Sequence, residues 1–101
     1  MIAELNDSYV KLAKMKGEYV WHQHDNEDEM FIVISGNLKI ELKDKILHLA
    51  PGDLVVIPRG VQHRPVAEDE VSVILIELKS TVSTGDATDT QDKTSTQGEW
   101  I

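Results

Sequence analysis

Short apolar runs separated by turn residues most constrain what this chain can fold into. Residues 30–34 (MFIVI), 53–58 (DLVVIP) and 71–78 (VSVILIEL) are rich in β-branched side chains, which favour strands. Residues 37–43 (NLKIELK) alternate apolar and polar side chains, the period of a half-buried strand. Residues 45–49 (KILHL) form a further short run, and glycine, proline and asparagine separate the runs. This spacing predicts an all-β sandwich or barrel.

The composition of the chain changes near residue 80. Residues 80–101 contain six Thr and three Ser, and few apolar side chains. We therefore expect one β-barrel domain over residues 1–79, followed by a polar C-terminal tail over residues 80–101. Two interpretations of the tail stay open: a disordered segment, or one that docks through its last residues, Trp100 and Ile101. Residues 9–15 (YVKLAKM) fit either a strand or a helix.

The net charge is −8, from 18 acidic and 10 basic residues. This balance argues against a nucleic-acid partner, whose phosphates require basic patches, and against an anionic membrane surface. The chain has no cysteine, which excludes disulfides and thiolate chemistry and favours a cytoplasmic location. No signal-peptide pattern is apparent at the N-terminus, and no apolar run is long enough to cross a membrane.

Two histidines one residue apart, His22 and His24, are the first candidates for chemistry. On a strand, side chains at i and i+2 point to the same face, so both imidazoles can converge on one ion. Glu29 follows a turn-forming stretch, Asp25–Asp28, and a hairpin would return its carboxylate beside the histidines. Two histidines and a carboxylate make a ligand set that suits Fe(II), Mn, Ni, Co or Zn.

A fourth candidate ligand, His63, follows the turn at Pro58-Arg59-Gly60. That turn reverses the chain, so His63 can face inward from a neighbouring strand. His48 alternates with inward-facing leucines, and we predict it at the surface. No second His, Tyr or Lys has a clear claim as a general acid or base.

Two spaced motifs give the chain a resemblance to small single-domain cupins. In that family, Gly, His-x-His, Glu and Gly follow at set intervals, and here Gly17, His22, His24, Glu29 and Gly36 occupy these positions. The second cupin motif, Gly, Pro-x-Gly and His, is similar to the stretch from Gly52 through Pro58 and Gly60 to His63. The sequence departs from the family pattern at two positions. The interval between Gly17 and His22 is one residue shorter, and Ala67 replaces the Asn that closes the second motif.

The resemblance implies the cupin double-stranded β-helix, a jelly-roll barrel. It also implies that His22, His24, Glu29 and His63 bind one divalent transition metal at the barrel centre, with Zn, Mn, Fe, Ni and Co all open. A small-molecule ligand and a homodimer are implied in the same way. Phe31 and Val33 alternate in step with Glu29, so on a strand they would face the same side as Glu29 and line the pocket. The rest of the wall would come from one of two alternating sets: Val73, Leu75 and Glu77, or Ile74 and Ile76.

Two functions remain open from the sequence. The first is a metal-dependent enzyme, dioxygenase-like or isomerase-like, that acts on a small oxygen-rich organic molecule in the barrel. The second is a non-catalytic module that binds or senses a small molecule. Fold alone does not decide between them, because cupin barrels carry many chemistries.

Overall fold

The computed structural model of the chain describes residues 2–82 and 85. These residues form strands and no helix, and none of the described segments could cross a membrane as a helix. The all-β fold class is therefore confirmed. The strands are β1 (Ala3–Leu5), β2 (Ser8–Glu18), β3 (Glu29–Ser35), β4 (Leu38–Leu42), β5 (Ile46–Leu49), β6 (Leu54–Ile57) and β7 (His63–Leu78).

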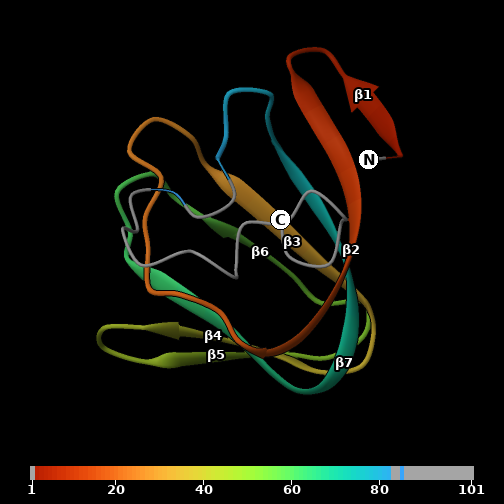
Figure 1. Ribbon diagram of the computed structural model, residues 1–101, viewed down its shortest axis with the longest axis vertical. Helices are drawn as coiled ribbons and strands as arrows, with labels where there is room; N and C mark the ends of the chain where they lie inside the picture. The colour runs from red at the N-terminus through yellow and green to blue at the C-terminus, as the bar shows by residue number, and fades with distance from the viewer. Residues whose placement is uncertain (1, 83–84, 86–101) are drawn as a thin grey trace.

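All strand pairs are antiparallel, and the long strand β7 connects them into a barrel (Figure 1). The main sheet has the order β1-β2-β7-β3-β6, while β4 pairs with β5 and with β7. Residues 71–78 of β7 lie between β2 and β3, whereas residues 63–66 pair with β4. One strand thus contributes to both layers of the jelly roll.

Strand alternation decides which side chains enter the core. Phe31 and Val33 are buried as expected, and the wall of β7 comes from the set that contains Val73, Leu75 and Glu77. The alternative set, Ile74 and Ile76, lies on the other face and is only partly buried. The core cluster consists of Ala13, Met15, Phe31, Val33, Leu38, Ile40, Leu49, Ile57, Ala67, Val71, Val73 and Leu75.

The structure resolves or corrects two strand boundaries. Residues 9–15, which fitted either a helix or a strand, lie within β2. β7 begins at His63, eight residues before the expected start at residue 71, because Arg64 to Ala67 pair with β4 and β2 despite a proline and flanking charges. Tertiary pairing overrides local propensity here. Whether the C-terminal tail is disordered or docks through Trp100 and Ile101 concerns residues that lie outside those described.

Candidate metal centre

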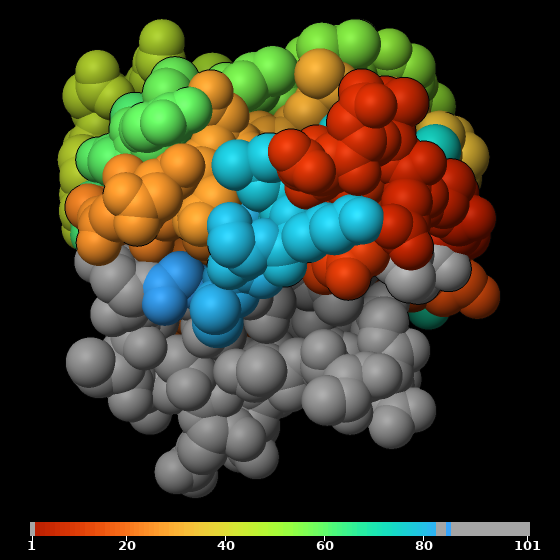
Figure 2. Space-filling view, turned by 90° about the horizontal axis from the view of Figure 1, so that it is seen from above, coloured from red at the N-terminus to blue at the C-terminus, as the bar shows by residue number. Residues whose placement is uncertain are grey.

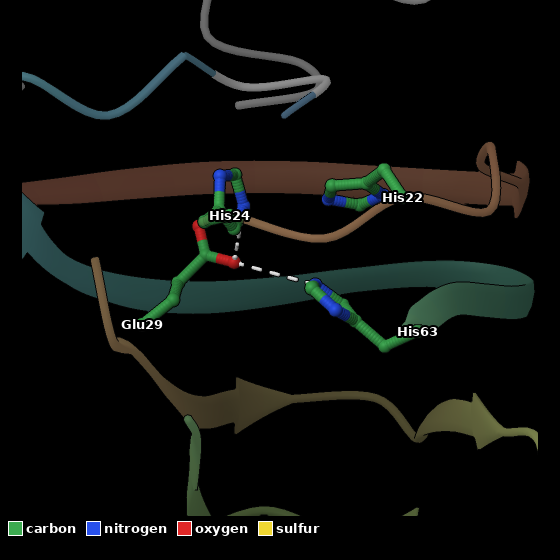
Figure 3. A group of neighbouring side chains, drawn as sticks. All are labelled: His22, His24, Glu29 and His63. Carbon is green, nitrogen blue, oxygen red and sulfur yellow. Dashed lines mark ion pairs between the residues drawn. The ribbon is translucent and has the colours of Figure 1, made fainter. Parts of the chain in front are cut away.

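The four predicted ligands lie together inside the barrel (Figure 3). His22, His24, Glu29 and His63 are each 4% exposed or less. Each offers one nitrogen or oxygen atom, and these atoms all lie within 4.8 Å of one another. Residues from the β2–β3 connection, β3 and β7 therefore meet at one buried point.

The histidine segment reaches this point without forming a regular strand, which corrects the sequence prediction. His22 makes an isolated bridge with His63, with backbone N–H···O distances of 3.0 and 2.9 Å. The amide of Gly60 donates to the carbonyl of His24 at 2.8 Å. The predicted hairpin between the histidines and Glu29 is also wrong, because Glu29 pairs in register with Ile57 and Glu77.

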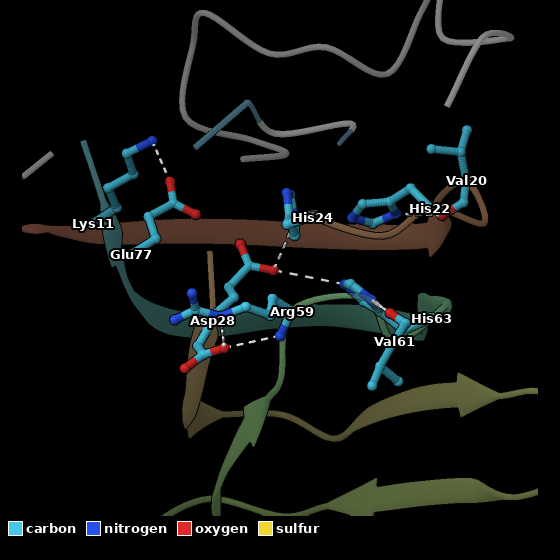
Figure 4. Close-up of polar contacts among 10 residues, drawn as sticks. Lys11, Val20, His22, His24, Asp28, Arg59, Val61, His63 and Glu77 are labelled. Carbon is cyan, nitrogen blue, oxygen red and sulfur yellow. Dashed lines mark hydrogen bonds and ion pairs between the residues drawn. The ribbon is translucent and has the colours of Figure 1, made fainter. Parts of the chain in front are cut away.

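Backbone carbonyls fix the orientation of two imidazole rings (Figure 4). Nδ1 of His22 lies 2.9 Å from the carbonyl oxygen of Val20, and Nδ1 of His63 lies 2.9 Å from that of Val61. A carbonyl only accepts hydrogen bonds, so in each neutral ring Nδ1 carries the proton and donates it. The Nε2 lone pairs are then free to bind an ion, the arrangement that oriented histidine ligands have in metal sites.

Buried polar atoms at the centre lack hydrogen-bond partners among the described residues. They are Nε2 of His24, Nε2 of His63 and Oε2 of Glu29. The two Nε2 atoms lie 3.3 and 3.6 Å from Oε1 of Glu29, as the dashed lines in Figure 3 show. Buried polar atoms are normally satisfied, and one cation between them would satisfy all of these. The residues present therefore fit a divalent metal ion with nitrogen and oxygen ligands.

The electrostatics of the cluster favour the protonation states that a metal requires at His22 and Glu29, and oppose the one it requires at His24. Burial, followed by the charge on His63, lowers the pKa of His22 to about 4, so this ring is neutral near pH 7. Burial opposes ionisation of Glu29, but its contacts with His24, His63 and Glu77 outweigh burial and hold its pKa below the usual range. Burial also lowers the pKa of His24, yet the nearby carboxylate of Glu29, with Oε1 3.3 Å from Nε2, prevails and raises it. Metal binding therefore competes with protonation at His24.

Two charged residues, Glu77 and Lys11, lie near the cluster, and the sequence predicted no chemical role for either. Glu77 is 1% exposed, and Nζ of Lys11 lies 2.6 Å from its Oε1 (Figure 4). Burial and the proximity of Glu29 raise the pKa of Glu77 to about 8, although Lys11 opposes this. The interior is thus more polar than the sequence indicated. In the sequence, only the alternation that places Glu77 on the same face as Val73 and Leu75 indicated that this carboxylate could be buried.

A third unpredicted neighbour, Tyr19, is buried beside His22, with ring centroids 5.5 Å apart. Phe31 lines the other side, 6.4 Å from the ring centroid of His63.

The segment after β7 lies against the histidine segment. Oγ of Ser80 donates to Glu27 at 2.8 Å, and a Cβ on Gly85 would overlap the carbonyl oxygen of Gln23. In Figure 2 this segment, in light blue, adjoins the β2–β3 connection in orange.

Three further residues, His48, Trp21 and Arg64, are not part of the cluster. His48 is exposed on β5, as predicted. Trp21 contacts Lys43, whose Nζ lies 3.9 Å from the ring centroid. Arg64 pairs with Glu41 at 2.7 Å.

Comparison with known proteins identifies the family. The family model of the cupin domain matches residues 8–79, which include all four clustered residues. The chain is a cupin. The predicted resemblance to cupins and the predicted jelly-roll barrel are confirmed.

Similar cupins are found among curated proteins and solved structures. The chain is 48% identical to YdbB of Bacillus subtilis (strain 168) over 64 residues, which are 62% of this chain and 57% of that protein. A cupin-2 domain protein of Shewanella frigidimarina shares 46% identity with a TM-score of 0.76, covering 77% of this chain and 76% of the other. A protein of Neisseria meningitidis shares 30% identity with a TM-score of 0.71, covering 78% and 82%.

Proposed function

We propose that His22, His24, Glu29 and His63 hold one divalent transition metal, Zn, Mn, Fe, Ni or Co, and that this cupin is a metal-dependent enzyme. The observation that carries the proposal is the convergence of buried, unpartnered Nε2 and Oε2 atoms on one point. The substrate is a small oxygen-rich organic molecule, and the reaction is dioxygenase-like or isomerase-like. A bound ion would supply a Lewis acid that polarises a substrate oxygen and lowers the pKa of water.

The residues of the chain have distinct roles in this proposal. The Val20 and Val61 carbonyls keep the His22 and His63 rings in the ligating tautomer. Phe31 forms an apolar wall beside His63 and excludes water from it, which strengthens electrostatic interactions in the site. Glu77 holds a proton near Glu29 at neutral pH, so it is the candidate to exchange a proton with a bound molecule.

Metal content tests the site directly. We expect protein purified without chelator to contain about one equivalent of a transition metal, and Glu29→Ala to lose most of it, because the carboxylate supplies the only anionic ligand of the set. His48→Ala is the matched control, since His48 is exposed on β5 outside the cluster. Elemental analysis measures both. Unchanged metal content in Glu29→Ala would falsify the site.

Product formation distinguishes a metal-dependent enzyme from a non-catalytic binding module. The identified metal decides the assay: oxygen uptake for iron or nickel, and isomerisation for zinc or manganese, each against a panel of small hydroxy and keto acids and sugars. We expect activity that disappears in Glu29→Ala and persists in His48→Ala. Metal-dependent ligand affinity without product formation would instead support the non-catalytic binding or sensory function.

We also propose a cytoplasmic homodimer with a barrel domain over residues 1–79 and a tail over residues 80–101. The absence of cysteine supports the location. The composition change at residue 80, just after β7 ends at Leu78, supports the domain boundary. Cupin membership supports the homodimer.

A further inference from the structure

The chain that follows β7 turns back towards the candidate metal centre. β7 ends at Leu78, and two tight turns follow it. The amide of Thr81 donates to the carbonyl of Leu78 at 2.9 Å, and the amide of Gly85 donates to the carbonyl of Val82 at 2.8 Å. Residues 80–82 and 85 are named the β7 extension. They lie beyond the part of the chain that the cupin family model matches, so family membership does not account for them.

Hydrogen bonds on two sides hold the β7 extension in place. Just before it, the amide of Lys79 donates to the carbonyl of Asp7 in the β1–β2 turn at 2.9 Å. At its first residue, the hydroxyl of Ser80 donates to the carboxylate of Glu27 in the β2–β3 connection at 2.8 Å. Because β7 lies between β2 and β3, the extension is fastened on both sides of the strand that it continues.

Gly85 approaches the candidate metal centre at backbone distance. A Cβ at this position would overlap the carbonyl oxygen of Gln23 and would lie 3.0 Å from Cδ2 of His22. In an imidazole ring, Cδ2 is bonded to Nε2, the nitrogen that His22 can offer to an ion. The β7 extension therefore passes directly beside the ligating edge of this ring.

The His22 ring is thus contacted on two opposite edges. Nδ1 lies 2.9 Å from the carbonyl oxygen of Val20, and Cδ2 lies against Gly85. These two atoms flank Cγ, so contacts at both oppose rotation of the ring about its Cβ–Cγ bond, which is a soft torsion in histidine. His22 is also only 2% exposed. Contacts that orient a ligand in this way are a normal part of metal sites.

We propose that the β7 extension is a wall of the candidate metal centre, and that Gly85 is the positioning residue through which this wall aligns the His22 ring and shields it from solvent. Glycine is required there for two reasons. The φ of 54° lies in the left-handed region, and a side chain would meet the backbone of Gln23. The wall belongs to the site of the proposed function, and the proposal rests on that function.

Chemical modification of histidines in the metal-free, full-length protein tests the wall. Diethyl pyrocarbonate reacts with accessible neutral imidazoles, and peptide mass spectrometry follows each histidine separately. The exposed His48 reports the activity of the reagent. His63, which is 0% exposed at the start of β7, reports opening of the whole barrel. The measured quantity is the reaction rate of His22 relative to that of His63.

Substitution of Gly85 should release the wall. We expect Gly85→Ala and Gly85→Asn to raise the relative rate of His22 about fivefold or more, because a side chain prevents the close approach and favours local opening. Asparagine tolerates a positive φ, so an effect in that variant is caused by side-chain volume. Gly52→Ala is the matched control, since Gly52 also has a positive φ but a Cβ there would meet no atom of the described residues within 4 Å. Its relative rate should equal that of the wild type.

Ser80→Ala is a milder variant that keeps the test decisive if the Gly85 variants do not fold. It removes the hydrogen bond to Glu27 and should raise the relative rate of His22 about twofold. A relative rate that stays at the wild-type value in every folded variant overturns the wall. So does a joint rise of His22 and His63, which would indicate unfolding of the barrel. Since the protein is metal-free throughout, failure to find metal in the purified protein would overturn the proposed function and leave this result standing.

Discussion

Single charged residues are tolerated inside this barrel because they lie beside one another. Lys11, Glu77 and Glu29 come from the adjacent strands β2, β7 and β3, and Lys11 contacts Glu77 at 2.6 Å. An unpaired buried charge is strongly destabilising. Glu29 and Glu77 are paired in register on adjacent strands, and their pKa values move apart: that of Glu29 is lowered and that of Glu77 is raised to about 8. Such separation is typical of sites that hold and release a proton.

The pH dependence of stability tests the protonation of Glu77. Its pKa rises from 4.5 to about 8 on folding, so the unfolded chain releases this proton first. The stability of the metal-free protein should fall as pH rises from about 4.5 to 8. Glu77→Gln removes this titratable carboxyl group and with it the fall in stability at high pH. We expect the variant to be more stable than wild type by about 1–3 kcal/mol at about pH 8.5 in urea unfolding, with the gain shrinking towards pH 5.

The exposed Glu68, whose side chain is 83% exposed, provides the control variant Glu68→Gln, for which no such pH-dependent gain is expected. If Glu77→Gln is instead less stable than wild type at high pH, then Glu77 is ionised and its ion pair with Lys11 is stabilising.

Individual elements are held in place by turns that require glycine. Gly36 in the β3–β4 turn has a φ of 82°, and a Cβ there would lie 2.7 Å from the carbonyl oxygen of Glu70. β7 therefore passes the β3–β4 turn at backbone contact. Gly52 in the β5–β6 turn has a φ of 90°, but a Cβ at this position would meet no atom of the described residues within 4 Å. Both glycines adopt a positive φ that favours glycine, but β7 closely approaches only Gly36.

This difference predicts unequal effects of alanine. Gly52→Ala should lose about 1 kcal/mol from the positive φ alone, whereas Gly36→Ala should lose about 1–2 kcal/mol more, because the backbone of β7 must move. Urea unfolding of both variants measures the difference. Equal destabilisation would show that the β7 contact relaxes without strain.

The whole molecule is required to assemble the candidate metal centre. His22 and His24 lie between β2 and β3, Glu29 begins β3, and His63 begins β7. The unfolded chain cannot hold these ligands within 4.8 Å of one another, so an ion that binds there binds the folded state. Ligand binding of this kind stabilises a protein by mass action.

Metal addition should therefore raise the melting temperature of chelator-treated protein. At a free metal concentration about a hundredfold above the dissociation constant, the expected gain is about 2.7 kcal/mol, which corresponds to roughly 10–20 °C for a domain of this size. Scanning calorimetry with metal and with chelator measures it. Glu29→Ala should show little of the shift, and an equal shift in that variant would place the binding elsewhere.

The sequence by itself determined the strand-forming runs, the turns between them and the identity of four candidate ligands. These follow from local chemistry: β-branched residues, glycine and proline, and histidines at motif spacing. It could not choose between the two faces of residues 71–78, since both alternate apolar side chains. Only the tertiary structure decided that Glu77 and Lys11 face inward. It also decided that backbone hydrogen bonds with Gly60 and His63 hold the His22–His24 segment in place. Finally, it decided that apolar residues of the main sheet, including Ile74 and Ile76, face outward. The physical reason is that burial and pairing depend on neighbours from distant strands, which set the register and thereby the face that each side chain occupies.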